Sequence, residues 1–386
     1  MTTETLCGDF YTHCFQAEQD KEHEGRLIIN MGPQHPSTHG VLRVIVEMEG
    51  EYISRAEPVI GYLHRMHEKM GEIKTYHQYM PNMGRVDYLH ALAWNWAYIG
   101  AVEKLCQIEV PRRAEFIRVI TCEMNRICSH LVWWGAYLLD LGAFTPIMYS
   151  FDDREQAVDL LQMITGSRLT YCYYRFGGVR TDINDAFIAG TRDFCKLMKS
   201  RLPMYKDLVT DNYILRKRCE EIGVLPLEMA RRYGATGPVL RGSGQKYDVR
   251  RAEPYSVYPE LDFEIPAFPE GDAMARYRVR VAEMEQSVRI IEQALDMLPQ
   301  GDFMAPKSPK RIKPPKGDVY FAVEGARGKI GIYIISDGSS TPYRLKLRSP
   351  SYSNLSLFAE LAKGTLLADA VSILGSLDLV IPEIDR

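Results

Sequence analysis

The stretch AEFIRVITCEMNRICSHLVWWGAYLLDL, residues 114–141, carries apolar side chains at intervals of three to four positions along its length. This spacing places them along one side of an α-helix, so the stretch predicts a long, packed helix. Pro111 lies just before it, where a proline suits the start of a helix. The same period predicts further helices at residues 63–79, 88–106, 153–164, 188–200, 204–221 and 274–298. Residues 150–153 resemble a capping box in front of one of them.

A shorter period marks two other parts of the chain. Residues 41–47 predict a strand that turns near Gly50 and returns through residues 52–55, which makes a hairpin. Strands are also predicted at residues 318–323, 329–336 and 343–347, and short helices at residues 354–363 and 366–374 close the chain. The sequence therefore predicts an α+β protein, mainly helical, in which small antiparallel sheets flank a bundle.

Composition divides the chain into five segments. Residues 1–25 are polar, mixed in charge and without clear period, so we expect a loosely held extension. A β-hairpin region follows at residues 26–62, and a helical core at residues 63–300. Residues 301–317 are rich in proline and lysine and predict a connector, as do residues 263–272. The last segment, residues 318–386, holds the second hairpin and the closing helices.

Bulk properties exclude several classes of function. The 386 residues are 46% hydrophobic and 25% charged, with a net charge of −3, and no long basic block suggests a nucleic-acid partner. No apolar run approaches the roughly 18 residues of a transmembrane helix, and the N-terminus lacks the pattern of a secretory signal. We expect a cytosolic chain that meets a membrane only through partners.

Metal and nucleotide motifs are also missing from the sequence. No two cysteines are spaced Cys-x-x-Cys, so we expect reduced thiols and no metal or cluster bound by this chain. The cysteines stand at Cys7, Cys14, Cys106, Cys122, Cys128, Cys172, Cys195 and Cys219. The string Gly242-Ser243-Gly244 lacks the remaining glycine and the strand-turn-helix context of a dinucleotide site, so NADH is not expected to bind here.

One loop carries residues suited to chemistry. Residues 31–40, MGPQHPSTHG, place His35 and His39 in a segment that two prolines and two glycines keep from becoming a helix. Such a shaped loop projects polar side chains, which is common at functional sites. Spacing alone fits equally well a surface turn in which the histidines are incidental.

This loop, together with RVDY at 85–88, LLDLGA at 138–143 and EIDR at 383–386, resembles the D subunit of respiratory NADH:quinone oxidoreductase, or complex I. That protein is related to the large subunit of [NiFe] hydrogenases, and the similarity runs from about residue 25 to residue 386. The resemblance implies a hydrogenase-large-subunit-like helical bundle. Hydrogenases hold their metals with two Cys-x-x-Cys pairs, which this chain lacks, so we expect no activation of hydrogen.

The resemblance also implies a set of catalytic residues. His39 and Tyr88 would donate hydrogen bonds to a quinone head group, and Asp140 would lie behind His39. Imidazolium and phenol are suitable donors, and a carboxylate orients a histidine and favours its charged form. His35 fits two roles equally well: it either braces the loop or supports the residues that contact the quinone. Taken singly, Tyr88 also suits helix packing, Asp140 a local hydrogen bond, and His39 a brace of its own loop.

A second set concerns the electron source. The resemblance implies a [4Fe–4S] cluster held by a neighbouring subunit that is similar to the hydrogenase small subunit. Arg65 matches an arginine close to that cluster, and Thr170 stands where many relatives have a histidine that couples the cluster's potential to pH. Threonine cannot titrate, so we expect that coupling to be missing. Residues 237–244, with Asp248 and Arg251, are interpreted as building an interface.

The function implied is that of the quinone-site subunit of a proton-translocating NADH:quinone oxidoreductase, which passes electrons from the partner's cluster to a membrane quinone. The expected location is the cytoplasmic face of the cell inner membrane. Expected partners are the cluster-bearing subunit, other peripheral-arm subunits and a membrane-arm subunit near the quinone channel. One alternative is the same role in a related complex fed by ferredoxin. The other is a structural scaffold without chemistry.

Overall fold

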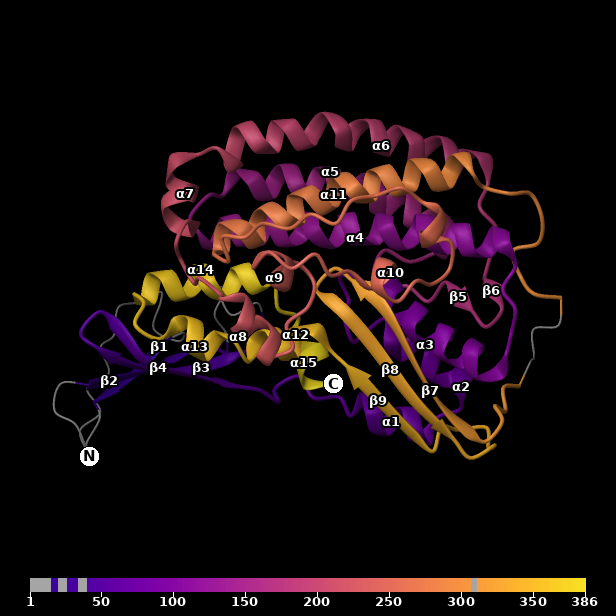
Figure 1. Cartoon of the computed structure of the whole chain (residues 1–386), viewed down its shortest axis with the longest axis horizontal. Coiled ribbons are helices and arrows are strands. Elements are labelled where there is room, and N and C mark those ends of the chain that lie inside the picture. The colour runs from indigo at the N-terminus through magenta and orange to yellow at the C-terminus, as the bar shows by residue number, and fades with distance from the viewer. Residues whose placement is uncertain (1–14, 20–25, 34–39, 307–310) are drawn as a thin grey trace.

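A bundle of long helices forms the larger part of the molecule. The computed structural model describes residues 15–19, 26–33, 40–306 and 311–386. Helices α4 (Arg112–Asp140), α5 (Thr145–Thr165), α6 (Asp185–Tyr205) and α11 (Ala273–Asp296) run alongside one another (Figure 1). Helix α4 packs against both α5 and α11, and it is buried on nearly all sides. The mainly helical α+β fold predicted from the sequence is confirmed.

Aromatic rings fill the space between these helices. The ring of Trp134 in α4 stacks on Tyr205 of α6 with 4.4 Å between ring centroids, and Trp133 stacks on Tyr137. Helix α3 (Ala91–Cys106) is buried along most of its length against the third sheet. Gly100 allows that close approach, because a Cβ there would lie 2.5 Å from a ring carbon of Phe321.

Three antiparallel sheets surround the bundle. The first has the order β1 (Phe15–Gln19), β2 (Arg26–Met31), β3 (Arg43–Glu49) and β4 (Tyr52–Val59). The second pairs β5 (Tyr174–Arg175) with β6 (Gly178–Val179). The third contains β7 (Gly317–Gly325), β8 (Gly328–Ser336) and β9 (Arg344–Arg348). The predicted hairpins at residues 41–55 and 318–336 are thereby confirmed.

A second, smaller core lies between the first sheet and the C-terminal helices. Alternate residues of β3, such as Val44, Val46 and Met48, face this core. The helices on its other side are α12 (Pro350–Leu355), α13 (Phe358–Ala362), α14 (Leu367–Leu377) and α15 (Ile381–Asp385). Figure 1 shows this layer at the end of the molecule opposite the third sheet. The two ends of the chain thus meet in one core.

Four expectations about single elements were wrong. Residues 15–19 are not part of a loose extension, because they pair with residues 27–31 as strand β1. The predicted helix 63–79 is two helices, α1 (His67–Ile73) and α2 (Tyr76–Met83), since Thr75 caps the second with Gln78. Residues 204–221 divide into the end of α6, a π-helical turn (Lys206–Thr210) and α7 (Tyr213–Cys219).

The capping box expected at residues 150–153 is the fourth. Helix α5 begins at Thr145 with Pro146 in its first turn, and Ser150 donates its hydroxyl to the carbonyl of Ile147 inside the helix. Short elements were also not predicted. They are α8 (Leu227–Arg232), α9 (Pro238–Arg241), α10 (Val249–Ala252) and a 3-10 turn (Tyr258–Glu260). Within the described ranges, no helix combines the length and apolar character needed to cross a bilayer.

Candidate functional site

The bend between α2 and α3 holds Tyr88 beside a buried group of charges. Asp87 accepts hydrogen bonds from the backbone N–H groups of Leu89 and His90 at 3.0 and 3.1 Å, which fixes the entry to α3. Its other carboxylate oxygen lies 3.2 Å from Nη1 of Arg327. Tyr88 itself is partly buried, as expected for a residue at the edge of a site.

Arg327 joins this bend to the C-terminal part of the chain. Its Nη2 lies 3.2 Å from Asp378, and its Nη1 also donates to the hydroxyl of Ser129 in α4. Asp378 follows α14 with a φ of 54°, a left-handed conformation that is uncommon for residues other than glycine. Arg327 is 1% exposed, so the guanidinium and its two carboxylates form a buried group next to Tyr88.

These charges and their burial set the protonation of the nearby groups. Burial raises the pKa of the Tyr88 phenol, and the carboxylate of Asp87 adds to the rise, while Arg327 opposes it. Tyr88 is therefore protonated at neutral pH and can donate a hydrogen bond. Burial also raises the pKa of Asp87, and with the neighbouring Asp87 it raises that of Glu383 to about 7. Glu383 accepts a hydrogen bond from the indole of Trp94 at 3.2 Å.

Asp140 lies at the other end of α4, as its last residue, and its side chain is partly buried. Ser129 of the same helix contacts Arg327, and positions 129 and 140 are about 16 Å apart along the axis at a rise of about 1.5 Å per residue. Asp140 therefore lies about three helical turns further along α4 than the residue that contacts Arg327.

His35 and His39 lie outside the described residues, within 34–39. The far end of their loop is fixed at Gly40, where a built Cβ would lie 4.0 Å from Cγ1 of Ile381 in α15. Helix α15 therefore flanks one end of the loop. The predicted pairing of His39 with Asp140, and the role of His35, stay predictions.

Arg65 lies just before α1, and Thr170 precedes Tyr171, whose backbone lies close to the C-terminal end of α2. Arg65 is exposed, and Arg65 and Arg85 both act electrostatically on buried His67, which lies between them. Burial first, then His64 and then these arginines, lower the pKa of His67 to about 4. A Cβ at Gly84, the neighbour of Arg85, would lie 3.0 Å from the carbonyl oxygen of Tyr171, the residue after Thr170. The predicted place of Arg65 and Thr170 beside a cluster stays a prediction.

The loop that carries Arg65 is tied to the C-terminus. Asp385 accepts hydrogen bonds from the backbone N–H groups of Gly61 and Leu63 at 2.9 and 2.7 Å. The ring Nδ1 of His64 lies 2.6 Å from the carbonyl oxygen of Asp385. The terminal motif EIDR thus braces this loop through Asp385 and approaches Trp94 through Glu383.

The interface interpretation of residues 237–244 and Asp248 was wrong for the charged residues among them. Arg241 and Asp248 are buried inside the chain, where they contact Glu324, Glu283 and Arg250. Within the described part of the chain, no three histidine, cysteine or acidic side chains are arranged to hold a metal ion.

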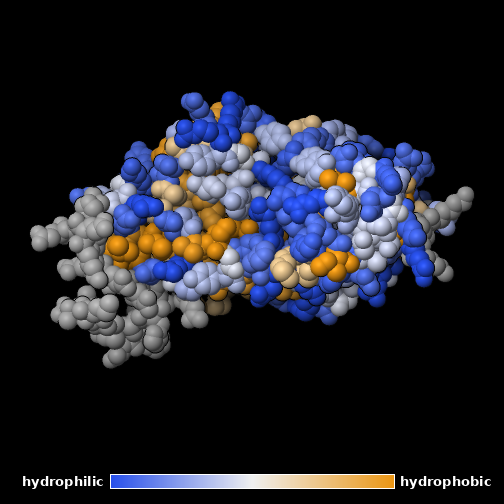
Figure 2. Space-filling view, turned by 90° about the horizontal axis from the view of Figure 1, so that it is seen from below, coloured by the Kyte–Doolittle hydropathy of each residue, from blue (hydrophilic) through white to orange (hydrophobic). Residues whose placement is uncertain are grey.

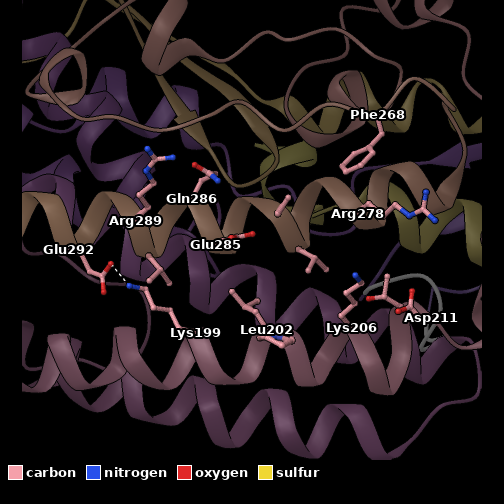
Figure 3. A pocket seen from close by; sticks show the side chains of 15 residues that line it. Lys199, Leu202, Lys206, Asp211, Phe268, Arg278, Glu285, Gln286, Arg289 and Glu292 are labelled. Atoms are coloured by element: carbon pink, nitrogen blue, oxygen red, sulfur yellow. Dashed lines mark hydrogen bonds and ion pairs between the residues drawn. The ribbon is translucent and has the colours of Figure 1, made fainter.

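A surface hollow lies away from these residues. It is a groove of about 1080 Å³ between α6 and α11, and Figure 3 shows Lys199 and Lys206 on one wall facing Glu285 and Glu292 on the other. Lys199 and Glu292 form an ion pair across it at 2.7 Å. None of the predicted site residues lines this groove.

An apolar area lies on the face turned toward the viewer in Figure 2. It covers the end of the molecule that carries the first sheet, whereas the opposite end of that face is mainly hydrophilic. Exposed apolar side chains also flank Arg65, with Ile60 42% and Met66 55% exposed. Apolar surface of this kind is typical of contact with another protein or an apolar ligand.

Sequence reasoning missed Arg327 and Asp378. Asp87 and Glu383 were inside the quoted motifs, but nothing in the sequence pairs them with residues more than two hundred positions away. The string Gly325-Ala326-Arg327-Gly328 held a signal for Arg327, because it places a charged residue in the tight turn between β7 and β8.

Comparisons with known proteins identify relatives of the whole chain. Residues 140–313 and 307–386 match the family model described as respiratory-chain NADH dehydrogenase, 49 Kd subunit. The chain is 61% identical to the second D subunit of NADH-quinone oxidoreductase of Opitutus terrae, over 93% of this chain and 90% of the relative. It is 62% identical to the D subunit of the same enzyme of Desulfotalea psychrophila, over 93% and 96%, and 49% identical to that of Geobacillus thermodenitrificans, over 93% and 98%.

Proposed function

The chain belongs to the family of the D subunit, or 49 Kd subunit, of NADH-quinone oxidoreductase (complex I), and from this premise we propose that it forms part of the site where quinone is reduced. As a member of that family it is one subunit of an oxidoreductase, and its partners are other subunits of complex I. NADH is bound elsewhere in the proposed assembly.

In the proposed site, Tyr88 and His39 donate hydrogen bonds to the two oxygens of the quinone ring. Reduction of a quinone takes two electrons and two protons, one proton for each oxygen. Asp140 orients His39 and favours its charged form. His35 acts behind these residues or braces the loop. The chain's own task is to hold the ring and supply protons, since the electrons come from another subunit.

The observation that carries the proposal is the setting of Tyr88. Its phenol is partly buried, and its raised pKa keeps it protonated at neutral pH, as a hydrogen-bond donor must be. Asp87 and Arg327 fix the backbone bend on which it stands. A tyrosine that only packed against a helix would not need this buried ionic support.

On the electron-input side, Arg65 is proposed to lie beside a [4Fe–4S] cluster of a subunit similar to the hydrogenase small subunit. A cation there favours the reduced, more negative cluster. Thr170 supplies no titrating group in the same region. The proposal puts the chain at the cytoplasmic face of the inner membrane, held there by peripheral-arm and membrane-arm partners, with a membrane quinone as substrate.

Two alternatives remain distinguishable by experiment. The same chain would serve a ferredoxin-fed complex, in which case the purified complex would oxidise reduced ferredoxin and not NADH. A structural scaffold would tolerate loss of the Tyr88 hydroxyl without loss of turnover. The names of the relatives favour NADH as the donor.

The test is Tyr88→Phe in the assembled complex, with Tyr343→Phe as the control. Tyr343 is 69% exposed and lies just before β9, so its hydroxyl is not expected to matter. Losing a donor to a reacting oxygen typically lowers the rate by about 10²–10³. Quinone reduction should fall accordingly, while assembly on a native gel and NADH-to-ferricyanide activity stay unchanged. Wild-type quinone turnover in Tyr88→Phe would refute the assignment.

A further inference from the structure

A group of buried ionisable residues leads from Tyr88 into the centre of the bundle, and the proposed function does not yet use it. We call it the polar column. Its side chains are at most 5% exposed. It consists of Asp87, Arg327, Asp378, Arg280, His130, Glu283, Arg241, Glu324 and Asp248.

The inner part of the polar column begins next to Tyr88. Arg327 bridges Asp87 and Asp378, and the second oxygen of Asp378 lies 3.6 Å from Nε of Arg280 in α11. Arg280 lies over the ring of Trp133, with its guanidinium carbon 4.4 Å from the ring centroid. Burial lowers the pKa of Arg280 to about 10, although Asp378 and Glu283 oppose the effect.

The middle part is the pair His130 and Glu283. Glu283 stands three positions after Arg280 on α11, which puts the two side chains on one face of the helix. Nε2 of His130 in α4 lies 2.9 Å from Glu283, and Arg241 of α9 donates to the other oxygen of the same carboxylate. Glu283 therefore joins the inner and outer parts of the column.

The outer part reaches the surface. Nη1 of Arg241 lies 2.9 Å from Glu324 and donates at 2.8 Å to the backbone carbonyl of Tyr247. Tyr247 lines a shallow surface hollow of about 340 Å³ together with Gln245. Burial and the neighbouring Asp248 raise the pKa of Glu324, while Arg241 opposes them, so this carboxyl holds a proton more readily than an exposed glutamate.

Several buried atoms along the column make no hydrogen bond to any group in the described part of the chain. They are Nε of Arg327, Oδ2 of Asp378, Nε and Nη2 of Arg280, Nδ1 of His130 and Nε of Arg241. Buried polar atoms left in this state normally bind internal water, since an unpartnered group costs about 1–3 kcal/mol or more. Waters at these atoms would join the carboxylates and the imidazole where the side chains do not touch.

We propose that the polar column is the route by which protons from the surface hollow at Tyr247 reach Tyr88, with Glu283 and His130 as its central relay. This inference rests on the proposed function. Arginine cannot give up its proton in a protein, so the arginines hold the carboxylates in place while carboxyls, imidazole and water carry the proton.

The proton balance is simple. The Tyr88 O–H bond breaks as its proton moves to a quinone oxygen that the partner's cluster has reduced. The resulting phenolate takes a proton from the Asp378 end of the column, and Glu283 with His130 replaces it from Glu324. Glu324, which is buried, is reprotonated by a proton that enters at the surface hollow beside Tyr247. One proton from bulk water is consumed for each proton given to the ring through Tyr88.

A purely structural reading explains the column less well. Buried ion pairs rarely add stability over apolar packing, because each ion loses its hydration. A stabilising group would also satisfy its own atoms, whereas here the unsatisfied atoms occur at Asp378, Arg280, His130 and Arg241 in succession.

The central test is Glu283→Gln in the assembled membrane complex. Glutamine keeps the shape and one acceptor but cannot carry a proton. The groups that face it are Arg241, His130, Arg126 and Arg280. Glu292→Gln on the same helix is the matched control, because Glu292 is part-exposed and pairs with the exposed Lys199.

Quinone reduction should fall about tenfold or more in Glu283→Gln, as for loss of a proton-transfer group. The H₂O/D₂O isotope effect on quinone reduction should rise, and the rate should fall more steeply toward high pH, where protons are scarce. NADH-to-ferricyanide activity should not change. An assembled Glu283→Gln complex with wild-type rate, pH profile and isotope effect would overturn the relay.

If Glu283→Gln does not assemble, Glu324→Gln at the outer end carries the same expectation. The wild-type complex supplies a test that needs no variant. Its rate in mixtures of H₂O and D₂O should follow a curve, because several protons move together, and a straight line or no isotope effect would overturn the proposal. Loss of activity in Tyr88→Phe with no effect of Glu283→Gln would leave the proposed function standing and remove only the relay.

Discussion

Removing Arg327 should destabilise the protein more than its size suggests. Arg327→Met leaves Asp87 and Asp378 as buried carboxylates that have lost a shared partner 3.2 Å from each. Removing one member of a buried ion pair typically costs about 3–5 kcal/mol. At about 1.4 kcal/mol per factor of ten, the folding equilibrium should fall roughly a hundredfold to several thousandfold.

The loss of folding stability in Arg327→Met should depend on pH in a definite direction. Burial raises the pKa of Asp87, and Arg327 lowers it, so the variant raises it further. A carboxyl whose pKa is higher in the folded than in the unfolded state favours folding at low pH, and this contribution is lost as pH rises through the folded pKa. The deficit of Arg327→Met should therefore be smaller at about pH 5.5 than at about pH 8.

The assay is the amount of assembled complex on a native gel, together with the temperature at which the complex loses activity at each pH. The decisive comparison is Arg327→Met combined with Asp87→Asn and Asp378→Asn, which removes the stranded charges. Asparagine can still cap α3 at position 87 and tolerates the left-handed φ of 54° at position 378. The reasoning is refuted if the triple variant is no more stable than Arg327→Met, or if the single variant matches the wild type.

Three further results are expected. Gly100→Ala should lower stability by about 1–3 kcal/mol through overpacking, because its Cβ would lie 2.5 Å from the Phe321 ring. Adding Phe321→Leu to Gly100→Ala should restore thermal stability. Equal melting temperatures of the wild type, Gly100→Ala and the double variant would contradict this. Asp140→Asn should lower quinone reduction and shift its pH profile, because an amide cannot stabilise a charged His39; an unchanged profile and rate would separate the two residues. In the wild type, the midpoint potential of the partner's cluster should be nearly independent of pH between about 6 and 8, and in Thr170→His it should vary with pH. Redox titration followed by electron paramagnetic resonance measures both. A potential that varies steeply with pH in the wild type would show that position 170 does not control this coupling.

The helices that were predicted well from the sequence are those whose apolar spacing lies within the helix itself. The period of α4 and α11 lies within each helix, so their limits were found to within a few residues. The first sheet shows the opposite case. Strand β1 is short and polar, and its pairing with β2 crosses a connection that the period of neither segment reveals. Propensity alone could not distinguish it from an extension.

Breaks inside helices were missed for a related reason. Thr75 ends one helix and starts the next through a cap with Gln78, and this local contact outweighs a continuous apolar period. In α5 the reverse happens, because Ser150 bonds back to the helix and Pro146 begins it one turn earlier. The same side-chain types cap or continue a helix according to the packing around them.

The residues of the candidate site show the same difference between local evidence and long-range contacts. Tyr88, Asp140, Arg65 and Thr170 were identified from motifs, and their roles stay predictions. The support of Tyr88 by Arg327 depends on contacts between residues far apart in sequence, which no local pattern contains.

The polar column adds a reason why periodicity could not find it. Along α4, Arg118, Glu123, Arg126 and His130 recur at intervals of three to five residues, as the solvent face of a helix would. Here that stripe is buried, because α11 and the β7–β8 turn cover it. The spacing of residues in the sequence reveals a stripe of charged side chains, but not whether water or protein covers it. Covering such a stripe with protein is costly unless each charge is paired with an opposite charge. Arg118 and Arg126 are held by Glu103 and Glu123, whereas His130 belongs to the polar column, and proton transfer to Tyr88 gives it a use that Glu283→Gln can test.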